Sequence, residues 1–194
     1  MRAILKKTDA EEEMEHIWYW FAYSFLGYCL EKLFAAATSS SHRLRRCFVF
    51  LPLCPVYGLA MLAVLALGTE SLPHLWERMA LGAFAATVVE YAVHWGYETL
   101  FGVQFWDYSS TKCDVNGRVC LPFSLCWGAL SALAVRYVQP VLKDYAARLP
   151  AGAAALAMFL VVLDGILTAR VLLVTRDIDA LTPRTLIRLR RRTA

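Results

Sequence analysis

The stretch that decides the fold runs from Glu90 to Gly128 and reads EYAVHWGYETLFGVQFWDYSSTKCDVNGRVCLPFSLCWG. It begins in an apolar segment that carries two glutamates and a histidine, and it leaves that segment at FGVQFWDYSS. After the polar turn DVNGR it enters a second apolar segment through VCLPFSLCWG. Polar side chains therefore flank a loop between two apolar segments. We predict that this loop is re-entrant or interfacial, at the edge of a membrane.

The composition of the chain supports a membrane protein. Of its 194 residues, 59% are hydrophobic and 19% are charged, whereas soluble domains are about 45 to 50% apolar. The apolar residues fall in blocks long enough to cross a hydrocarbon core of about 30 Å, which takes about 20 helical residues. We therefore predict an all-α polytopic membrane protein whose residues 1–194 form a single transmembrane domain.

About five transmembrane helices are expected along the chain. A polar lead precedes them, a basic tail follows them, and the loop described above joins the third and fourth. The expected ranges are 1–16 for the lead, 17–37, 47–68, 76–101, 118–138 and 151–174 for the helices, and 175–194 for the tail. A turn around Pro140–Pro150 separates the last two helices.

The first two helices carry further signals. A cleaved signal peptide ending near Ala35–Ala37 is the alternative for the first, but the acidic run before its apolar part argues against it. In the second, Pro52 and Pro55 predict an irregular start, because proline removes amide donors. Irregular backbone at membrane depth must face protein or water, so we expect this segment to lie inside the protein.

The distribution of Lys and Arg predicts the orientation. Five spans place the two termini on opposite sides, and cytoplasmic loops hold an excess of Lys and Arg. The loops and tail on the C-terminal side hold the larger number. We predict a multi-pass protein of the cell membrane with its N-terminus outside and its C-terminus in the cytoplasm.

Under this topology, ionisable side chains gather in the cytoplasmic half. An ionised group facing the bilayer centre costs about 2.5 to 3.5 kcal/mol, so these side chains are expected to face one another. In such a cluster Arg118 pairs with Glu31, Glu98 or Asp107. The cluster comprises Glu31, Glu90, His94, Glu98, Arg118 and Asp164.

Several short blocks in order resemble a known family. They are YSFLGYCLE (Tyr23–Glu31), RRCFVFLPLCPVYG (Arg45–Gly58), the single Glu90, FGVQFWDYS (Phe101–Ser109), NGRVCL (Asn116–Leu121) and SLCWG (Ser124–Gly128). In these blocks the chain resembles the ABC-transporter type IV family, often called CmpB-like. It departs from the family pattern at four positions, with Tyr28 for Trp, Arg45 for Asn, and Cys47 and Leu51 for glycines.

The cluster and the matched blocks together give the candidate binding residues. We predict that they bind a substrate or an ion, with no metal and no cofactor. They are Glu31, Tyr57, Glu90, His94, Glu98, Trp106, Asp107, Tyr108, Ser109, Asn116, Arg118, Ser124, Trp127 and Asp164.

Two groups of candidates have structural alternatives. Glu90, His94 and Glu98 share one helix face at i, i+4 and i+8, which suits a structural polar network, a proton or ion relay, or a metal site using His94 and one glutamate. One metal cannot take both glutamates, since about 12 Å of helix rise separates them. Trp106 and Tyr108 also fit an interfacial aromatic belt, beside a turn capped by an aspartate and a serine.

The remaining features exclude other classes. The six cysteines show no C-x-x-C spacing and are interpreted as reduced, apolar-like residues. The basic tail is interpreted as an anchor near anionic lipid rather than as a nucleic-acid site. No Walker A motif occurs, so any ATPase would be a separate subunit.

These observations give one function and two alternatives. The family resemblance implies a permease-like component whose polar cluster moves a small polar solute or ion. Its expected partners are membrane lipids and either a second copy of the chain or an ATPase subunit. One alternative is a membrane enzyme acting on a lipid or isoprenoid head group, with Glu90 or Asp107 as base and Arg118 holding an anionic group. The other is a non-catalytic scaffold or regulator.

Overall fold

The computed structural model describes residues 9–38 and 46–192. Most of this part of the chain is helical, and its only strands form one short hairpin, so the all-α class is confirmed. The helices are α1 (Asp9–Ala37), α2 (Pro55–Ala66), α3 (Leu75–Phe101), α4 (Leu121–Leu133), α5 (Gln139–Ala146), α6 (Ala151–Thr175) and α7 (Pro183–Arg192). The start of the expected lead, most of the loop after the first helix and the last two residues of the tail lie outside the described residues.

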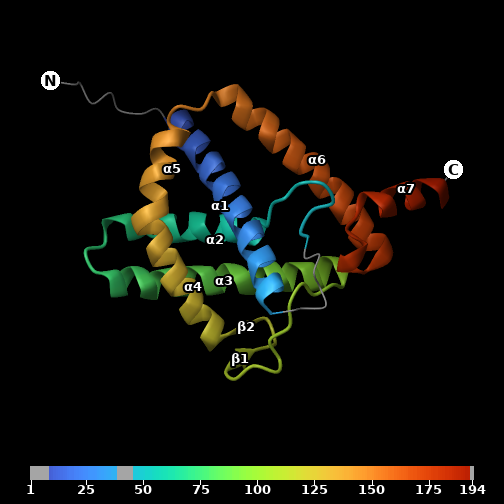
Figure 1. Cartoon of the computed structure of the whole chain (residues 1–194), viewed down its shortest axis with the longest axis horizontal. Helices are drawn as coiled ribbons and strands as arrows, with labels where there is room; N and C mark the ends of the chain where they lie inside the picture. The colour runs from blue at the N-terminus through green and yellow to red at the C-terminus, as the bar shows by residue number, and fades with distance from the viewer. Residues whose placement is uncertain (1–8, 39–45, 193–194) are drawn as a thin grey trace.

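The helices cross rather than forming a parallel bundle. In Figure 1, α2 and α3 run side by side, joined through the short 3₁₀ turn η1 (Thr69–Ser71), and α1 and α4 cross them. Contacts link α1 with α2, α3 with α4, and α5 and α6 with α1. Helix α7 lies beside the C-terminal end of α6 (Figure 1).

Small residues allow α3 and α4 to approach closely. A Cβ atom added at Gly128 would lie 2.6 Å from the Met79 carbonyl oxygen, and one added at Gly82 would lie 2.8 Å from the Ser131 Cβ. On the other side, Gly27 of α1 lies directly beneath the Tyr57 ring of α2. Glycine at these positions therefore sets the helix separations around the centre of the protein.

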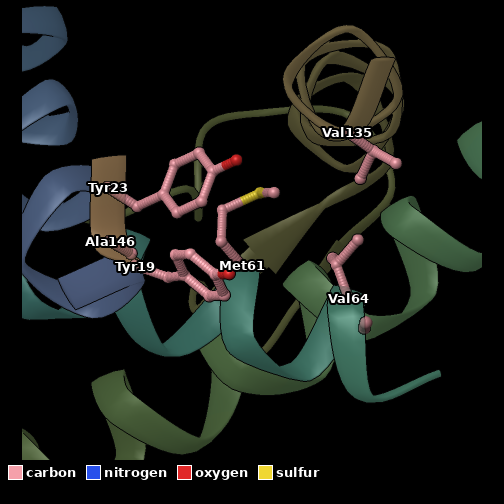
Figure 2. Close-up of a cluster of buried hydrophobic side chains, with 7 residues drawn as sticks. Tyr19, Tyr23, Met61, Val64, Val135 and Ala146 are labelled. Carbon is pink, nitrogen blue, oxygen red and sulfur yellow. The ribbon is translucent and has the colours of Figure 1, made fainter. Parts of the chain in front are cut away.

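The main buried cluster joins α1, α2 and the helix after α4. Figure 2 shows Tyr19 and Tyr23 projecting from α1 toward Met61 of α2, with Val64 and Val135 nearby. These side chains are almost fully buried. They hold α1 against α2 and against the helical segment that follows α4.

The fourth helix is longer than expected. The sequence predicted an end at 138 and a turn from Pro140, but the structure has one continuous helix over Leu121–Ala146. The π-helical turn η2 (Ala134–Val138) joins α4 to α5. Proline lacks an amide and clashes with the preceding turn of a regular α-helix, and a wider π turn just before Pro140 relieves this conflict. The predicted turn over 140–150 is therefore wrong for most of its length.

The second helix is shorter than expected, and its start confirms the proline argument. It begins at Pro55 rather than at 47, because the preceding residues are irregular. Within this irregular segment the Sγ atoms of Cys47 and Cys54, both free thiols, lie 2.9 Å apart. The Asp164 carboxylate of α6 accepts hydrogen bonds from the amides of Phe50 and Leu51, at 2.9 and 2.7 Å.

The loop between α3 and α4 contains a small antiparallel hairpin. Strand β1 (Asp114–Val115) pairs with β2 (Val119–Cys120). Asn116 and Gly117 form the turn with positive φ angles of 57° and 68°, and the amide of Gly117 donates to Asp114 Oδ2 at 2.8 Å. Arg118 therefore lies in the hairpin and not at the start of the fourth helix, as the sequence had suggested.

Two helical stretches of the described residues are long and apolar enough to cross a membrane. They are Leu121–Ala146 and Gly152–Thr175, and only 22% of each apolar stretch is buried within the chain. Large side chains of α6 such as Leu156, Phe159 and Ile166 are exposed, as lipid-facing side chains would be. The five-span arrangement and the orientation of the termini stay predictions.

Candidate functional site

A pocket of about 450 Å³ lies between α1, α2, α3 and the α4–η2 helix. Its walls are mainly apolar and aromatic. Two carboxylates line it, Glu31 from α1 and Glu90 from α3. The loop after α3 contributes Trp106 and Tyr108, so this loop forms part of the pocket wall.

Glu90 is the most enclosed carboxylate of the pocket, with 6% of its surface exposed. Its Oε1 accepts a hydrogen bond from the Tyr108 hydroxyl at 3.1 Å, and its Oε2 accepts one from the Trp127 indole N–H at 3.0 Å. Burial, then the Glu90 carboxylate, raises the pKa of Tyr108 well above its usual value, so the phenol stays a donor. The loop, α3 and α4 thus converge on a single carboxylate.

Glu31 is held from the opposite wall. The Tyr57 hydroxyl of α2 donates to Glu31 Oε1 at 2.7 Å. The Tyr57 ring meets the Trp127 ring edge-to-face, with centroids 5.4 Å apart. Because Trp127 also binds Glu90, these two aromatic side chains connect the two carboxylates.

His94 does not line the pocket but holds the loop that does. The structure places its Nε2 2.9 Å from the Trp106 carbonyl oxygen, and since a carbonyl only accepts, Nε2 carries the proton. The Trp106 indole N–H donates in turn to the Arg118 carbonyl at 2.8 Å. The buried Nδ1 of His94 has no hydrogen-bond partner among the described residues and lies 3.9 Å from Glu98 Oε2.

Arg118 pairs with Glu98 outside the pocket. Its Nε and Nη2 donate to Glu98 Oε2 at 3.1 and 2.7 Å, and its Nη1 donates to the Tyr91 hydroxyl at 2.8 Å. These hydrogen bonds, first that with Glu98, raise the pKa of Arg118. Asn116 also donates to the Tyr91 hydroxyl, at 2.9 Å. This pairing ties the hairpin to the end of α3.

Asp107 and Ser109 form a local turn. Asp107 accepts from the Ser109 amide at 2.8 Å and from the Ser109 hydroxyl at 3.1 Å. The hydrogen bond from the amide, followed by that from the hydroxyl, lowers the pKa of Asp107. The neighbouring Gly117 leaves room for this carboxylate, since a Cβ there would lie 2.9 Å from Oδ1. Asp107 does not pair with Arg118 in this structure.

The other two candidates lie apart from the pocket. Ser124 accepts a hydrogen bond from Thr87 at 2.8 Å, which joins α3 to α4. Asp164 binds the irregular segment before α2 and is not part of a shared cluster with Glu31 and Glu90. The predicted set therefore divides into pocket, loop-fixing and helix-joining residues.

Three residues that matter here were missed by the sequence argument. Tyr91 binds both Arg118 and Asn116, and it lies seven residues before Glu98, on the same helix face. Tyr23 and Tyr137 line the pocket. The spacing of Tyr23, Gly27 and Glu31 at i, i+4 and i+8 was a signal for a shared face.

The comparisons with known proteins give one family. A family described as "Putative ABC-transporter type IV" matches residues 18–169, a range that includes the whole pocket. No curated protein and no solved structure matches the chain. The match confirms the resemblance seen in the sequence blocks, and with the two apolar helices it assigns the protein to membranes and to a transporter-like role. The chain therefore belongs to the ABC-transporter type IV family.

Proposed function

We propose that this protein is a permease-like membrane component that binds a small solute in the pocket around Glu31 and Glu90. The observation that carries the proposal is the pocket itself, about 450 Å³ in volume, with two carboxylates set in aromatic walls. Small-molecule sites are typically about 300 to 1,000 Å³, mainly apolar, with a few placed polar groups. The pocket has these properties.

The contacts of the two carboxylates suit binding better than catalysis. Tyr57, Tyr108 and Trp127 each donate one hydrogen bond and fix how the carboxylates face the pocket. An enzyme acting on an anionic head group would need Arg118 in the same space. Arg118 is instead engaged by Glu98 and Tyr91.

Transport also needs an energy source or a partner. The sequence holds no Walker A motif, and the family is described as "Putative ABC-transporter type IV". We therefore propose that a separate ATPase subunit couples to this protein, and that two copies of the chain enclose the transport path. Co-purification from native membranes, followed by identification of the bound subunits, tests this part.

Binding can be tested with a solute library and thermal unfolding in detergent micelles. A solute that binds the folded protein but not the unfolded chain raises its Tm, and the rise grows roughly with the logarithm of the solute concentration once this exceeds the Kd. We expect some solutes to raise the Tm of the wild type and not that of the Glu31→Gln, Glu90→Gln double variant. Asp144→Asn, which changes an exposed carboxylate of α5, is the control and should behave as wild type. Equal Tm shifts in all three proteins would place the binding site elsewhere.

A further inference from the structure

The partners of Glu90 indicate which kind of solute the pocket accepts. Both of its hydrogen-bond donors, the Tyr108 hydroxyl and the Trp127 indole, are neutral. No basic side chain of the described residues hydrogen-bonds or ion-pairs with Glu90 in this structure. A buried ionised carboxylate is costly unless a cation or several donors satisfy it, so a positively charged solute would gain stabilisation here.

The aromatic walls favour the same charge. Tyr57, Trp106, Tyr108, Trp127 and Tyr137 all line the pocket. The faces of tyrosine and tryptophan rings attract cations, and aromatic cages commonly recognise quaternary ammonium groups in this way. Tyr57 and Trp127 stand at 87° to each other, which gives two walls of a cage next to the carboxylates.

The opening of the pocket favours a solute with an apolar body. Among the lining residues, Leu26 of α1 and Leu130, Leu133 and Tyr137 of the α4–η2 helix are exposed. The pocket therefore opens between α1 and this helix, which is one of the two stretches apolar enough to cross a membrane. A hydrated inorganic ion would have to give up its hydration shell at such an apolar mouth. The apolar part of an amphipathic molecule would instead be buried there favourably.

We propose that the ligand of this pocket is an amphipathic organic cation, an ammonium group attached to an apolar body. The ammonium group lies between Glu90, Glu31 and the aromatic rings, and the apolar part extends toward the mouth. This inference rests on the proposed function, since it names the class of solute that the same pocket binds. The ammonium can belong to a free amine or to a lipid head group.

The test compares one cation with its uncharged copy of the same shape. Benzyltrimethylammonium and neopentylbenzene have the same shape and differ only in that a charged nitrogen replaces a neutral carbon. Their binding is measured by equilibrium dialysis in uncharged maltoside micelles, and the uptake by micelles without protein is subtracted. We expect the cation to bind at least about ten-fold more tightly, a difference of about 1.4 kcal/mol. This preference should fall toward unity in Glu90→Gln and persist in Asp144→Asn. Glu31→Gln, which should also weaken it, serves if Glu90→Gln does not fold.

Each result decides a different point. Equal or tighter binding of neopentylbenzene by the wild type would overturn the cation inference and leave a pocket that binds solutes by apolar contact. A preference for the cation that survives both glutamine variants would also overturn it. Binding of neither probe would count against the proposed function as well. Competition by short-chain phosphatidylcholine would assign the ammonium to a lipid head group, and its failure would assign it to a free amine; both results support the site.

Discussion

Glu90 shows how much one side chain depends on its neighbours. Its place on an apolar helix was visible in the sequence, and so was the expectation that it avoids lipid. Its two donors were not visible, because Tyr108 and Trp127 lie 18 and 37 residues away along the chain. Only the fold of the loop after α3 brings them to the same carboxylate.

Replacing Glu90 by leucine should destabilise the protein more than replacing it by glutamine. Leucine leaves the Tyr108 hydroxyl and the Trp127 N–H without an acceptor, and each buried unpaired group costs about 1 to 3 kcal/mol. Glutamine keeps one oxygen for a donor. Thermal unfolding in micelles should therefore give the lowest Tm for Glu90→Leu, and adding Tyr108→Phe should recover part of the loss. Equal Tm values for the leucine and glutamine variants would mean that these donors reach water.

Arg118 should couple energetically to one acid only. The sequence left three candidates, and the structure pairs Arg118 with Glu98 through two nitrogens. Glu98 is 37% exposed, so solvent screens the pair, and Arg118→Ala should lower the Tm by less than Glu90→Leu does. A double-mutant cycle with Glu98→Gln should show coupling, and the matched cycle with Asp107→Asn should show none. Coupling to Asp107 alone would contradict this arrangement of the hairpin.

At the scale of elements, prolines had two different outcomes. Pro52 and Pro55 delay the start of α2, as local chemistry predicts. Pro140 does not end the fourth helix, because the π turn before it removes the conflict. A single sequence does not show whether a helix will form a π turn before a proline.

Two glycines of α3 should respond in opposite ways to alanine. A Cβ at Gly82 would lie 2.8 Å from the Ser131 Cβ, whereas one at Gly96 would meet nothing within 4 Å. Gly82→Ala should destabilise by about 1 to 3 kcal/mol through overpacking. Gly96→Ala should stabilise by about 0.4 to 1 kcal/mol, since alanine costs less backbone entropy in a helix. Unfolding free energies of the two variants check this. No loss at Gly82 would contradict the close α3–α4 contact, and a loss at Gly96 would contradict its open surroundings.

Asp164 should act on structure and not on solute binding. It accepts from the amides of Phe50 and Leu51 and is 4% exposed. Hydrogen bonds to a charged group contribute about 1.5 to 3 kcal/mol, so Asp164→Ala should lower the Tm clearly and Asp164→Asn less. Hydrogen exchange at residues 49–51 should rise in the alanine variant. Loss of solute binding in a folded Asp164→Asn protein would return this residue to the site.

At the scale of the whole molecule, composition was enough to predict the fold class but not the number of membrane spans. The all-α class predicted from the apolar blocks is confirmed, and the family match with the two apolar helices supports the membrane. The clustering argument grouped six ionisable residues, of which Glu31 and Glu90 share the pocket. His94, Glu98 and Arg118 lie around the loop outside it, and Asp164 binds the segment before α2. Assigning ionisable residues to one half of the bilayer gives the depth of each residue along its helix. It does not give the direction in which the side chain points.

The topology prediction can be tested directly. A reporter fused after Ala194 should be found in the cytoplasm, and one placed before Glu11 should be found outside, because Lys and Arg are more numerous on the C-terminal side. Glycosylation or cysteine-labelling reporters give this measurement, with a fusion in the 147–150 turn as an internal control for the outer side. Both ends on one side would exclude five spans.

The π turn at Ala134–Val138 also sets the rotational phase of everything after it. One residue added to a helix turns the following segment by about 100° about the axis. Gln139 and Ala146 are the buried residues of α5. The Tyr23 hydroxyl donates a hydrogen bond to Gln139 Oε1 at 2.9 Å. If a single residue of the turn were deleted, this face would swing away from α1 and present Lys143 or Asp144 in a different direction. The fit of α5 on α1 therefore depends on the length of the chain at this point as much as on the identity of its side chains.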